Sequence, residues 1–200
     1  NNLILNKMVI LGIETSCDET SVSILEDGII LSNIIVSQSE HEKFGGVIPD
    51  LASRNHEKLI YGVTRKSIKK SQYNLKDISA ISVTYGPGLS GSLLVGINFA
   101  KGLALGLGIP LIGVNHLEGH LLSHLINKTH MRYPYLCLLV SGGHTQIVLV
   151  EKNKRIVLSK TVDDAAGEAF DKGARILGLK YPGGPEIERV SIGGNPKKYK

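Results

Sequence analysis

An internal repeat is the feature that most constrains the fold of this 200-residue chain. Residues 9–36 follow the order strand, polar loop, strand, tight turn, strand, and residues 135–161 follow the same order. Three positions of the first copy match the second at a constant offset of 125: Thr20 with Thr145, Ile24 with Leu149, and Glu26 with Glu151. Chance likeness between two hairpins is the alternative, since strand alternation is common. The repeat predicts two related α/β domains facing a cleft, expected at residues 9–130 and 131–200.

Helix and strand signals lie between and after the two copies. Strands are expected at 78–84 and 111–114, and helices at 49–71, 90–107, 115–126 and 165–177. Ser90 or Ser92 is the expected cap of the second helix. The most apolar stretch, Leu93–Val114, is long enough to cross a membrane, but Asn98, Lys101, Pro110 and five glycines interrupt it. We therefore expect a buried helix followed by a buried strand.

Composition narrows the class of protein. The chain has 23 Lys and Arg against 18 Asp and Glu, so its net charge of +5 permits a nucleic-acid partner without requiring one. Its two cysteines, Cys17 and Cys137, form neither a disulfide framework nor a four-ligand zinc site. A reducing compartment is expected. The first residues do not resemble a signal peptide, because their apolar run continues directly into a strand pattern.

A histidine pair is the clearest chemical signal. His116 and His120 are four residues apart on an expected helix, so both imidazoles can bind one metal ion, although two solvated histidines would have the same spacing. A metalloprotease needs a glutamate directly after the first histidine, whereas Glu118 comes one residue later. His124 would lie about 12 Å along the helix axis from His116, too far to join the same ion.

Four further segments carry candidate chemistry, and each has a structural alternative. Residues 141–145 (SGGHT) suit close backbone approach to a ligand or an ordinary turn. Residues 14–20 (ETSCDET) suit a metal–phosphate group or a solvated loop. Residues 85–92 (YGPGLSGS) lack the lysine of a phosphate-binding Walker loop and suit tight packing or anion binding. Residues 163–172, with 181–185, suit a nucleoside site or an acidic helix start.

Together, and in this order, these segments resemble the TsaD family, formerly called Gcp, from about Val9 to Asn195. The matching strings are GIETSCDET, GGVIPDLASRNH, YGPGLSGSLLVG, NHLEGH, LVSGGHTQ, DDAAGEAFDK and YPGGP. The resemblance implies the α/β fold of actin, Hsp70 and sugar kinases (ASKHA), with duplicated domains around a cleft and the second domain incomplete here. It also implies transfer of a threonylcarbamoyl group from threonylcarbamoyl-AMP to the N6 amine of adenosine 37, in tRNAs reading codons that start with A.

The resemblance also assigns residues. It implies that His116 and His120 bind one divalent metal ion per subunit, iron or zinc, and that Asp18 and Glu19 are catalytic residues near the phosphate and metal. The positions implied to bind the adenylate are Leu139, Val140, Ser141, Gly142, Gly143, Asp171, Gly184 and Glu188. Implied partners are tRNA, threonylcarbamoyl-AMP and, in a bacterium, TsaB-like and TsaE-like accessory proteins, with no membrane. The expected location is the cytoplasm, or the mitochondrion in a eukaryote.

One departure from the family pattern matters for function. Family members usually continue well past Lys200, and the rest should supply an Asp metal ligand and an Asn that contacts adenine. Weak metal retention and doubtful catalysis are therefore expected from this piece alone. Alternatives are an inactive fragment, a metal-dependent glycoprotease, a small-molecule kinase of the same fold and a non-catalytic scaffold. The residues expected to contact tRNA are Arg65, Lys66, Lys69, Lys70, Lys197, Lys198 and Lys200.

Overall fold

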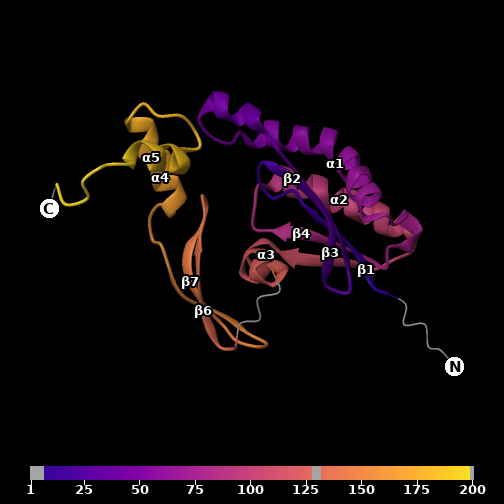
Figure 1. Ribbon diagram of the computed structural model, residues 1–200. Helices are drawn as coiled ribbons and strands as arrows, with labels where there is room; N and C mark the ends of the chain where they lie inside the picture. The colour runs from indigo at the N-terminus through magenta and orange to yellow at the C-terminus, as the bar shows by residue number, and fades with distance from the viewer. Residues whose placement is uncertain (1–6, 128–131, 199–200) are drawn as a thin grey trace. The chain divides into compact units, whose positions relative to one another are not determined.

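A computed structural model describes residues 7–127 and 132–198. The chain divides into two compact units, which are treated separately below (Figure 1). The first unit comprises residues 7–39 and 47–127, and the second comprises residues 40–46 and 132–198. The domain boundary expected at residues 130 and 131 lies outside the described residues. The segment 40–46 is grouped with the second unit although it lies between two stretches of the first unit in the sequence.

The first unit is built on a five-stranded sheet with the order β3-β2-β1-β4-β5. Its strands are β1 (Val9–Glu14), β2 (Glu19–Glu26), β3 (Ile29–Ser37), β4 (Ala80–Gly86) and β5 (Leu111–Asn115). The first three strands form an antiparallel meander, whereas β4 pairs parallel with both β1 and β5. The carboxyl ends of β1, β4 and β5 therefore meet at one edge of the sheet.

Two long helices cover one face of this sheet (Figure 1). Helix α1 (Pro49–Ser71) packs on β2 and β3, and α2 (Ser90–Leu107) packs on β4 and on α1. The alternation of β1 buries Val9, Leu11 and Ile13 beneath them. The core consists of Val9, Leu11, Ile13, Val22, Ile24, Ile60, Val63, Ile78, Ile81, Val83, Ala100 and Ala104.

Helix α2 differs from expectation at its start. Leu89 occupies the N-cap position and no side chain caps the helix, so the expected cap at Ser90 or Ser92 is wrong. Ser92 lies inside the helix and is fully buried. Of the helices that the structure describes, α2 alone has the length and apolar composition to cross a membrane. A single helix of this kind is weak evidence for a membrane span, because helices in protein cores have the same length and apolar composition.

The remaining elements of the first unit are short. Helix α3 (His116–Leu122) follows β5 directly and continues as the 3-10 helix η3 (Ser123–Asn127), so the helix expected over 115–126 tightens in its second half. The 3-10 turn η2 (Leu75–Asp77) was not expected, nor was η1 (Ser39–Phe44), most of which belongs to the segment 40–46 of the second unit.

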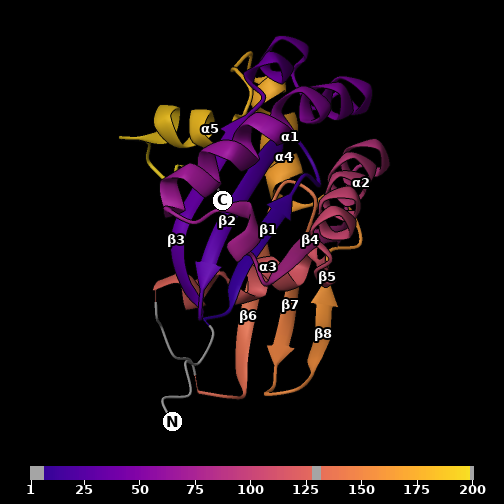
Figure 2. The ribbon, with the colours of Figure 1, turned by 90° about the vertical axis from the view of Figure 1, so that its right-hand side faces the viewer.

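The second unit contains a three-stranded antiparallel sheet, whose strands run next to one another in Figure 2. It consists of β6 (Tyr135–Val140), β7 (Thr145–Val150) and β8 (Arg155–Lys160), followed by α4 (Ala166–Ile176) and α5 (Gly183–Ser191). The guanidinium of Arg175 on α4 donates to the carbonyl of Gly45 at 2.8 Å, which ties the segment 40–46 to this unit. The strand order expected from the repeat is confirmed in both units, whereas α5 was not expected.

Candidate functional site

The two histidines of the HxxxH motif lie together at the start of α3. The side-chain carbonyl of Asn115 accepts hydrogen bonds from the backbone N–H groups of Leu117, at 2.9 Å, and Glu118, at 3.4 Å, so it caps the helix. His116 and His120 are therefore one turn apart on one face. Their Nε2 atoms are 3.1 Å apart, and their rings cross at 84°.

This nitrogen separation fits two ligands of one metal ion. Metal–nitrogen bonds of about 2.0–2.1 Å place two ligand nitrogens about 2.9 Å apart at right angles and about 3.3 Å apart in a tetrahedron. The observed 3.1 Å lies between these values. In the metal-free protein the same distance accommodates a hydrogen bond from one imidazole to the other. The two rings can therefore converge on an ion without a change of backbone.

Glu14 and Ser16 hold the other side of the first histidine. The Nδ1 atom of His116 is 3.4 Å from Glu14 Oε1 and 3.2 Å from Ser16 Oγ. The Ser16 backbone N–H donates to the same Glu14 oxygen at 2.9 Å. A carboxylate at Nδ1 favours the tautomer that leaves Nε2 free as a metal ligand, and it fixes the plane of the ring. The sequence placed Glu14 in the candidate segment 14–20 but did not pair it with His116, and the structure shows that contact.

The charge state of Glu14 suits this contact. Partial burial raises the pKa of the Glu14 carboxyl, but hydrogen bonds from His116 and Ser16 outweigh burial and leave the pKa below its ordinary value. The carboxylate is therefore ionised at neutral pH and accepts a proton-bearing Nδ1. A signal for this pairing existed in the sequence: Glu14 ends one strand and His116 follows another, and the ends of parallel strands meet.

Asp18 and Glu19 occupy the connection from β1 to β2. Glu19 begins β2, and its Oε1 atom accepts from the Ser37 hydroxyl at 2.8 Å. The Asp18 carbonyl accepts from the Gln38 backbone N–H at 3.1 Å. Burial, together with the neighbouring Asp18 carboxylate, raises the pKa of the Cys17 thiol to about 12. The structure thus places Glu14 at His116 Nδ1 and Glu19 at the end of β3, and the catalytic role of Asp18 and Glu19 stays a prediction.

The described residues do not by themselves supply a complete set of metal ligands. Among residues 7–127 and 132–198, no group of three or more His, Cys, Asp or Glu side chains is placed to hold a metal ion. Zinc sites use at least three protein ligands, so the histidine pair fits a metal ion only together with a further donor. Within the described residues His124 is not grouped with the pair as a third ligand, and its Nδ1 atom bonds the Leu121 carbonyl of its own helix at 3.0 Å.

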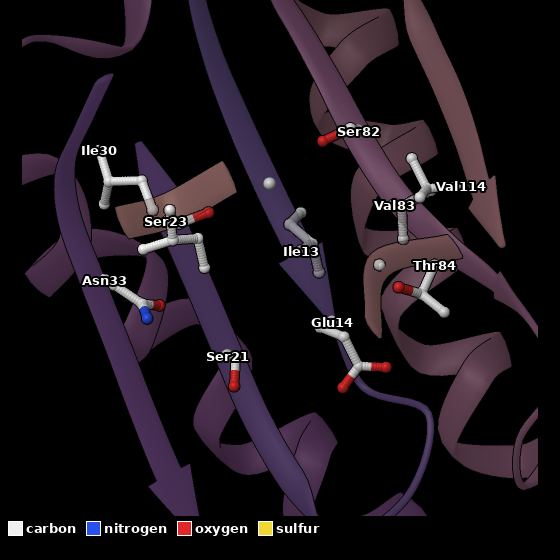
Figure 3. A pocket seen from close by; sticks show the side chains of 13 residues that line it. Ile13, Glu14, Ser21, Ser23, Ile30, Asn33, Ser82, Val83, Thr84 and Val114 are labelled. Atoms are coloured by element: carbon white, nitrogen blue, oxygen red, sulfur yellow. The ribbon is translucent and has the colours of Figure 1, made fainter. Parts of the chain in front are cut away.

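A trough of about 330 Å³, lined by both polar and apolar side chains, adjoins this site in the first unit (Figure 3). Gly12, Ser23 and Ser82 lie side by side on three neighbouring strands, and α3 and η3 contribute Gly119 and Ile126. A side chain at position 12 would meet the Ser23 hydroxyl at 2.8 Å, so glycine keeps the trough open. The polar side chains around it in Figure 3 are Glu14, Ser21, Ser23, Asn33, Ser82 and Thr84.

In the second unit, the predicted adenylate loop lies between β6 and β7. Ser141 closes the turn: its N–H donates to the His144 carbonyl at 2.8 Å, and its hydroxyl accepts from the His144 N–H at 3.0 Å. A β-carbon on Gly142 or Gly143 would meet nothing within 4 Å, so their backbone is open to a ligand. Leu139 is buried at 7% exposure, whereas Val140 is exposed, so Leu139 belongs to the packing of the strand.

The amino-terminal end of α4 packs against this loop. The Gly167 N–H donates to the Ser141 carbonyl at 3.2 Å, and a β-carbon at position 167 would lie 2.8 Å from that oxygen. The Ala166 N–H is bonded to the Thr145 hydroxyl at 2.8 Å. A helix amino terminus carries partial positive charge, so the loop and α4 together suit a bound anion.

The predicted nucleoside contacts gather where α4 meets α5. Asp171 lies one turn beyond Gly167, and its Oδ1 atom accepts from the N–H of Gly183, the first residue of α5, at 2.7 Å. A β-carbon at Gly183 would lie 2.6 Å from the Phe170 carbonyl, so only glycine permits this approach. Gly184 and Glu188 follow on α5, one turn apart. The structure brings the three predicted residues to one junction and gives Asp171 a structural bond as well.

Comparison with known proteins identifies the family. Residues 29–200 match the family model described as "TsaD: tRNA N6-adenosine threonylcarbamoyltransferase". The chain belongs to the TsaD family. A relative in Thermosipho africanus with that enzyme name is 59% identical over 194 residues, which cover 96% of this chain and 59% of the relative. A Phocaeicola vulgatus relative of the same name is 50% identical over 197 residues, which cover 96% of this chain and 58% of the relative.

Solved structures show that this TsaD-family chain has the ASKHA type of fold, as expected. A ROK hexokinase from Thermus thermophilus superposes with a TM-score of 0.53 at 14% identity, over 95% of this chain and 71% of that one. YeaZ from Pseudomonas aeruginosa superposes with a TM-score of 0.50 at 18% identity, over 77% of this chain and 66% of that one. The chain spans about three fifths of the length of the curated relatives it matches.

Proposed function

We propose that the protein containing this chain transfers the threonylcarbamoyl group from threonylcarbamoyl-AMP to the N6 amine of adenosine 37, in tRNAs that read codons starting with A. The observation that carries the proposal is the convergent pair His116 and His120, held by Glu14 and Ser16, in a chain of the TsaD family. Relatives that cover almost all of this chain bear the name of that activity.

In this proposal each unit of the chain has a separate task. His116 and His120 would hold one divalent ion, iron or zinc, which acts as a Lewis acid when bound. The open backbone of Gly142 and Gly143, with the start of α4, binds the adenylate phosphate, and Asp171, with Gly184 and Glu188, contacts the nucleoside. The N6 amine forms a bond to the carbamoyl carbon, the bond from that carbon to the phosphate oxygen breaks, and AMP leaves.

The amine is a weak nucleophile, so orientation of the two substrates provides much of the rate. The amine also loses a proton in the reaction. Asp18, Glu19 or a group of the substrate accepts this proton; the contacts of Asp18 and Glu19 do not favour one over the other. We assign the reaction to a reducing compartment, the cytoplasm or a mitochondrion, and the two unpaired cysteines are consistent with that assignment.

Exposed surfaces of α1 support the proposed partners. Arg65, Lys66 and Lys69 are exposed on α1, and the Arg65 guanidinium stacks over the Tyr61 ring at 5.7 Å. These cations suit tRNA phosphates.

Between α1 and α2, apolar and aromatic side chains line hollows that suit a protein partner. We propose that this partner is a TsaB-like protein, with a TsaE-like protein in the same assembly. The hollows are lined by Ile60, Tyr61, Ile68, Leu75, Leu94, Phe99 and Leu103.

A metalloprotease remains the second candidate from the sequence, and the geometry disfavours it. Glu118 follows His116 by two residues, which is about 200° around a helix, so it projects away from the face that the histidines share. A water bound at the histidine pair would therefore lack the carboxylate base that the protease motif provides. An inactive fragment is the other alternative, because the third metal ligand is not among the described residues of this chain.

The test uses the intact protein, labelled threonylcarbamoyl-AMP and tRNA with adenosine or guanosine at position 37. Labelled tRNA and released AMP should appear in equal amounts, and only with adenosine. His120→Ala should abolish transfer and bound metal, whereas His124→Ala should change neither, because His124 bonds its own helix. Transfer that is insensitive to His120→Ala would refute the proposed metal role, and labelling of the guanosine tRNA would refute the proposed acceptor.

A further inference from the structure

We propose that His56 is a positioning residue that holds residues 15–19 in the shape that presents Ser16 to His116. This positioning does not depend on the proposed function; only its effect on threonylcarbamoyl transfer rests on that proposal. His56 lies on α1, far in sequence from the histidine pair, and its side chain is fully buried. It belongs to the string GGVIPDLASRNH, which the proposed reaction leaves without a role.

Both ring nitrogens of His56 bond the connection from β1 to β2. Nε2 is 2.9 Å from the Cys17 carbonyl oxygen, and Nδ1 is 2.8 Å from the hydroxyl oxygen of Thr20, which is also fully buried. A carbonyl only accepts, so Nε2 carries the hydrogen; in the neutral ring Nδ1 then accepts from the Thr20 hydroxyl. The ring therefore bridges the loop to the start of β2 and bonds the buried Thr20 hydroxyl and the Cys17 carbonyl at once.

Other elements hold the neighbouring residues of the loop. The Thr15 hydroxyl donates to the Ser92 carbonyl on α2 at 2.8 Å. The Leu89 backbone N–H donates to the Ser16 carbonyl at 2.7 Å. Hydrogen bonds from α2 and Leu89 thus hold one part of the loop, and His56 on α1 holds another. The carbonyl that His56 bonds belongs to Cys17, the residue directly after Ser16.

The effect on the site follows from this order of residues. The Ser16 hydroxyl is 3.2 Å from His116 Nδ1, and the Ser16 N–H bonds Glu14. Without His56, the Cys17 carbonyl loses the hydrogen bond that ties it to α1, and the peptide after Ser16 is free to turn towards another donor. Ser16 then moves, and the Nδ1–H tautomer of His116 loses part of its support. Changes in such supporting contacts lower metal affinity by about 10–100-fold.

The experiment compares three variants of the intact protein. His56→Gln keeps an N–H that can reach the Cys17 carbonyl, whereas His56→Ala removes both bonds. Ser67→Ala is the matched control: it removes a buried hydrogen bond from α1 to Ser32 on β3, away from the loop. The readouts are long-range ¹H–¹⁵N NMR correlations of the His116 ring, cobalt(II) affinity by absorption, and thermal unfolding of each variant.

His56→Ala should shift His116 from the Nδ1–H form to a mixture of tautomers and weaken cobalt binding by about 10–100-fold. His56→Gln should retain the original form, and Ser67→Ala should lower stability without changing either readout. An unchanged His116 spectrum in folded His56→Ala would overturn the inference. If that variant does not fold, His56→Asn replaces it, and a His116 spectrum in His56→Asn equal to that of the unsubstituted protein would be equally decisive. The NMR readout needs no metal, so it separates this inference from failure of the proposed function.

Discussion

Helix α2 approaches the loop after β1 closely at one of its glycines and not at another. Replacing glycine by alanine should therefore change the free energy of unfolding in opposite directions at these two positions. Gly96 and Gly102 both lie in α2. A β-carbon at Gly96 would lie 2.3 Å from Thr15 Oγ1, 3.3 Å from its Cγ2 and 3.4 Å from its Cβ, whereas one at Gly102 would meet nothing within 4 Å. Gly96→Ala should therefore destabilise the protein and Gly102→Ala should stabilise it.

The magnitudes follow from the contacts. Replacing glycine by alanine inside a helix stabilises it by about 1 kcal/mol when there is room, which applies to Gly102. At Gly96 the same gain is opposed by overpacking, at about 1–3 kcal/mol. Rotating Thr15 would not relieve the clash, because its Cγ2 and Cβ are also near, and it would break the buried bond to the Ser92 carbonyl. Losing that bond costs about 1–3 kcal/mol more, so Gly96→Ala should lose about 1–5 kcal/mol in all.

Urea unfolding followed by circular dichroism measures both free energies. Cobalt titration in the same samples measures the histidine site, which should weaken in Gly96→Ala alone, because Thr15 adjoins Ser16. A shift of both unfolding midpoints in the same direction would show that the approach of α2 to Thr15 is not constrained. That result would favour anion binding over tight packing as the interpretation of the string YGPGLSGSLLVG.

Three further predictions concern other residues. The pKa of about 12 leaves about 10⁻⁴ of the Cys17 thiol ionised at pH 8. Because a thiolate of high pKa is the stronger nucleophile, iodoacetamide should alkylate Cys17 only about 50–100-fold more slowly than an ordinary thiol, and the rate should rise tenfold per pH unit. Mass spectrometry of the Cys137→Ser variant measures this rate. Asp171→Asn keeps an oxygen for the Gly183 N–H but loses its charge, so adenylate affinity by calorimetry should fall by about 10–150-fold while tRNA affinity holds. Lys69→Glu should remove about one phosphate contact, so the slope of log affinity for tRNA against log salt concentration should become less steep by about one. An unchanged slope in filter binding would count against that surface.

Elements with strong local signals could be predicted from the sequence. The alternation in Val9–Glu14, the helical period of Pro49–Ser71 and the repeated strand order gave bounds that agree with the structure. Helix α5 was missed because it begins Gly-Gly-Pro, two weak helix formers followed by a residue tolerated only in a first turn. The α2 cap was misplaced because backbone geometry makes Leu89 the cap, although serine has the better side chain.

Contacts between distant elements explain what local reasoning missed in the candidate site. The spacing of His116 and His120 is local, so one helical turn was enough to bring their rings together. Glu14 meets His116 across 102 positions only because β1, β4 and β5 are parallel neighbours, and a periodic pattern does not specify that order. The glycines are informative for the same reason: Gly88 and Gly96 are small because Ser16 and Thr15 lie against them. The strings YGPGLSGSLLVG and GGVIPDLASRNH, which matched the family without an evident chemical role, therefore contain residues that contact one and the same loop, the one beside the histidine pair.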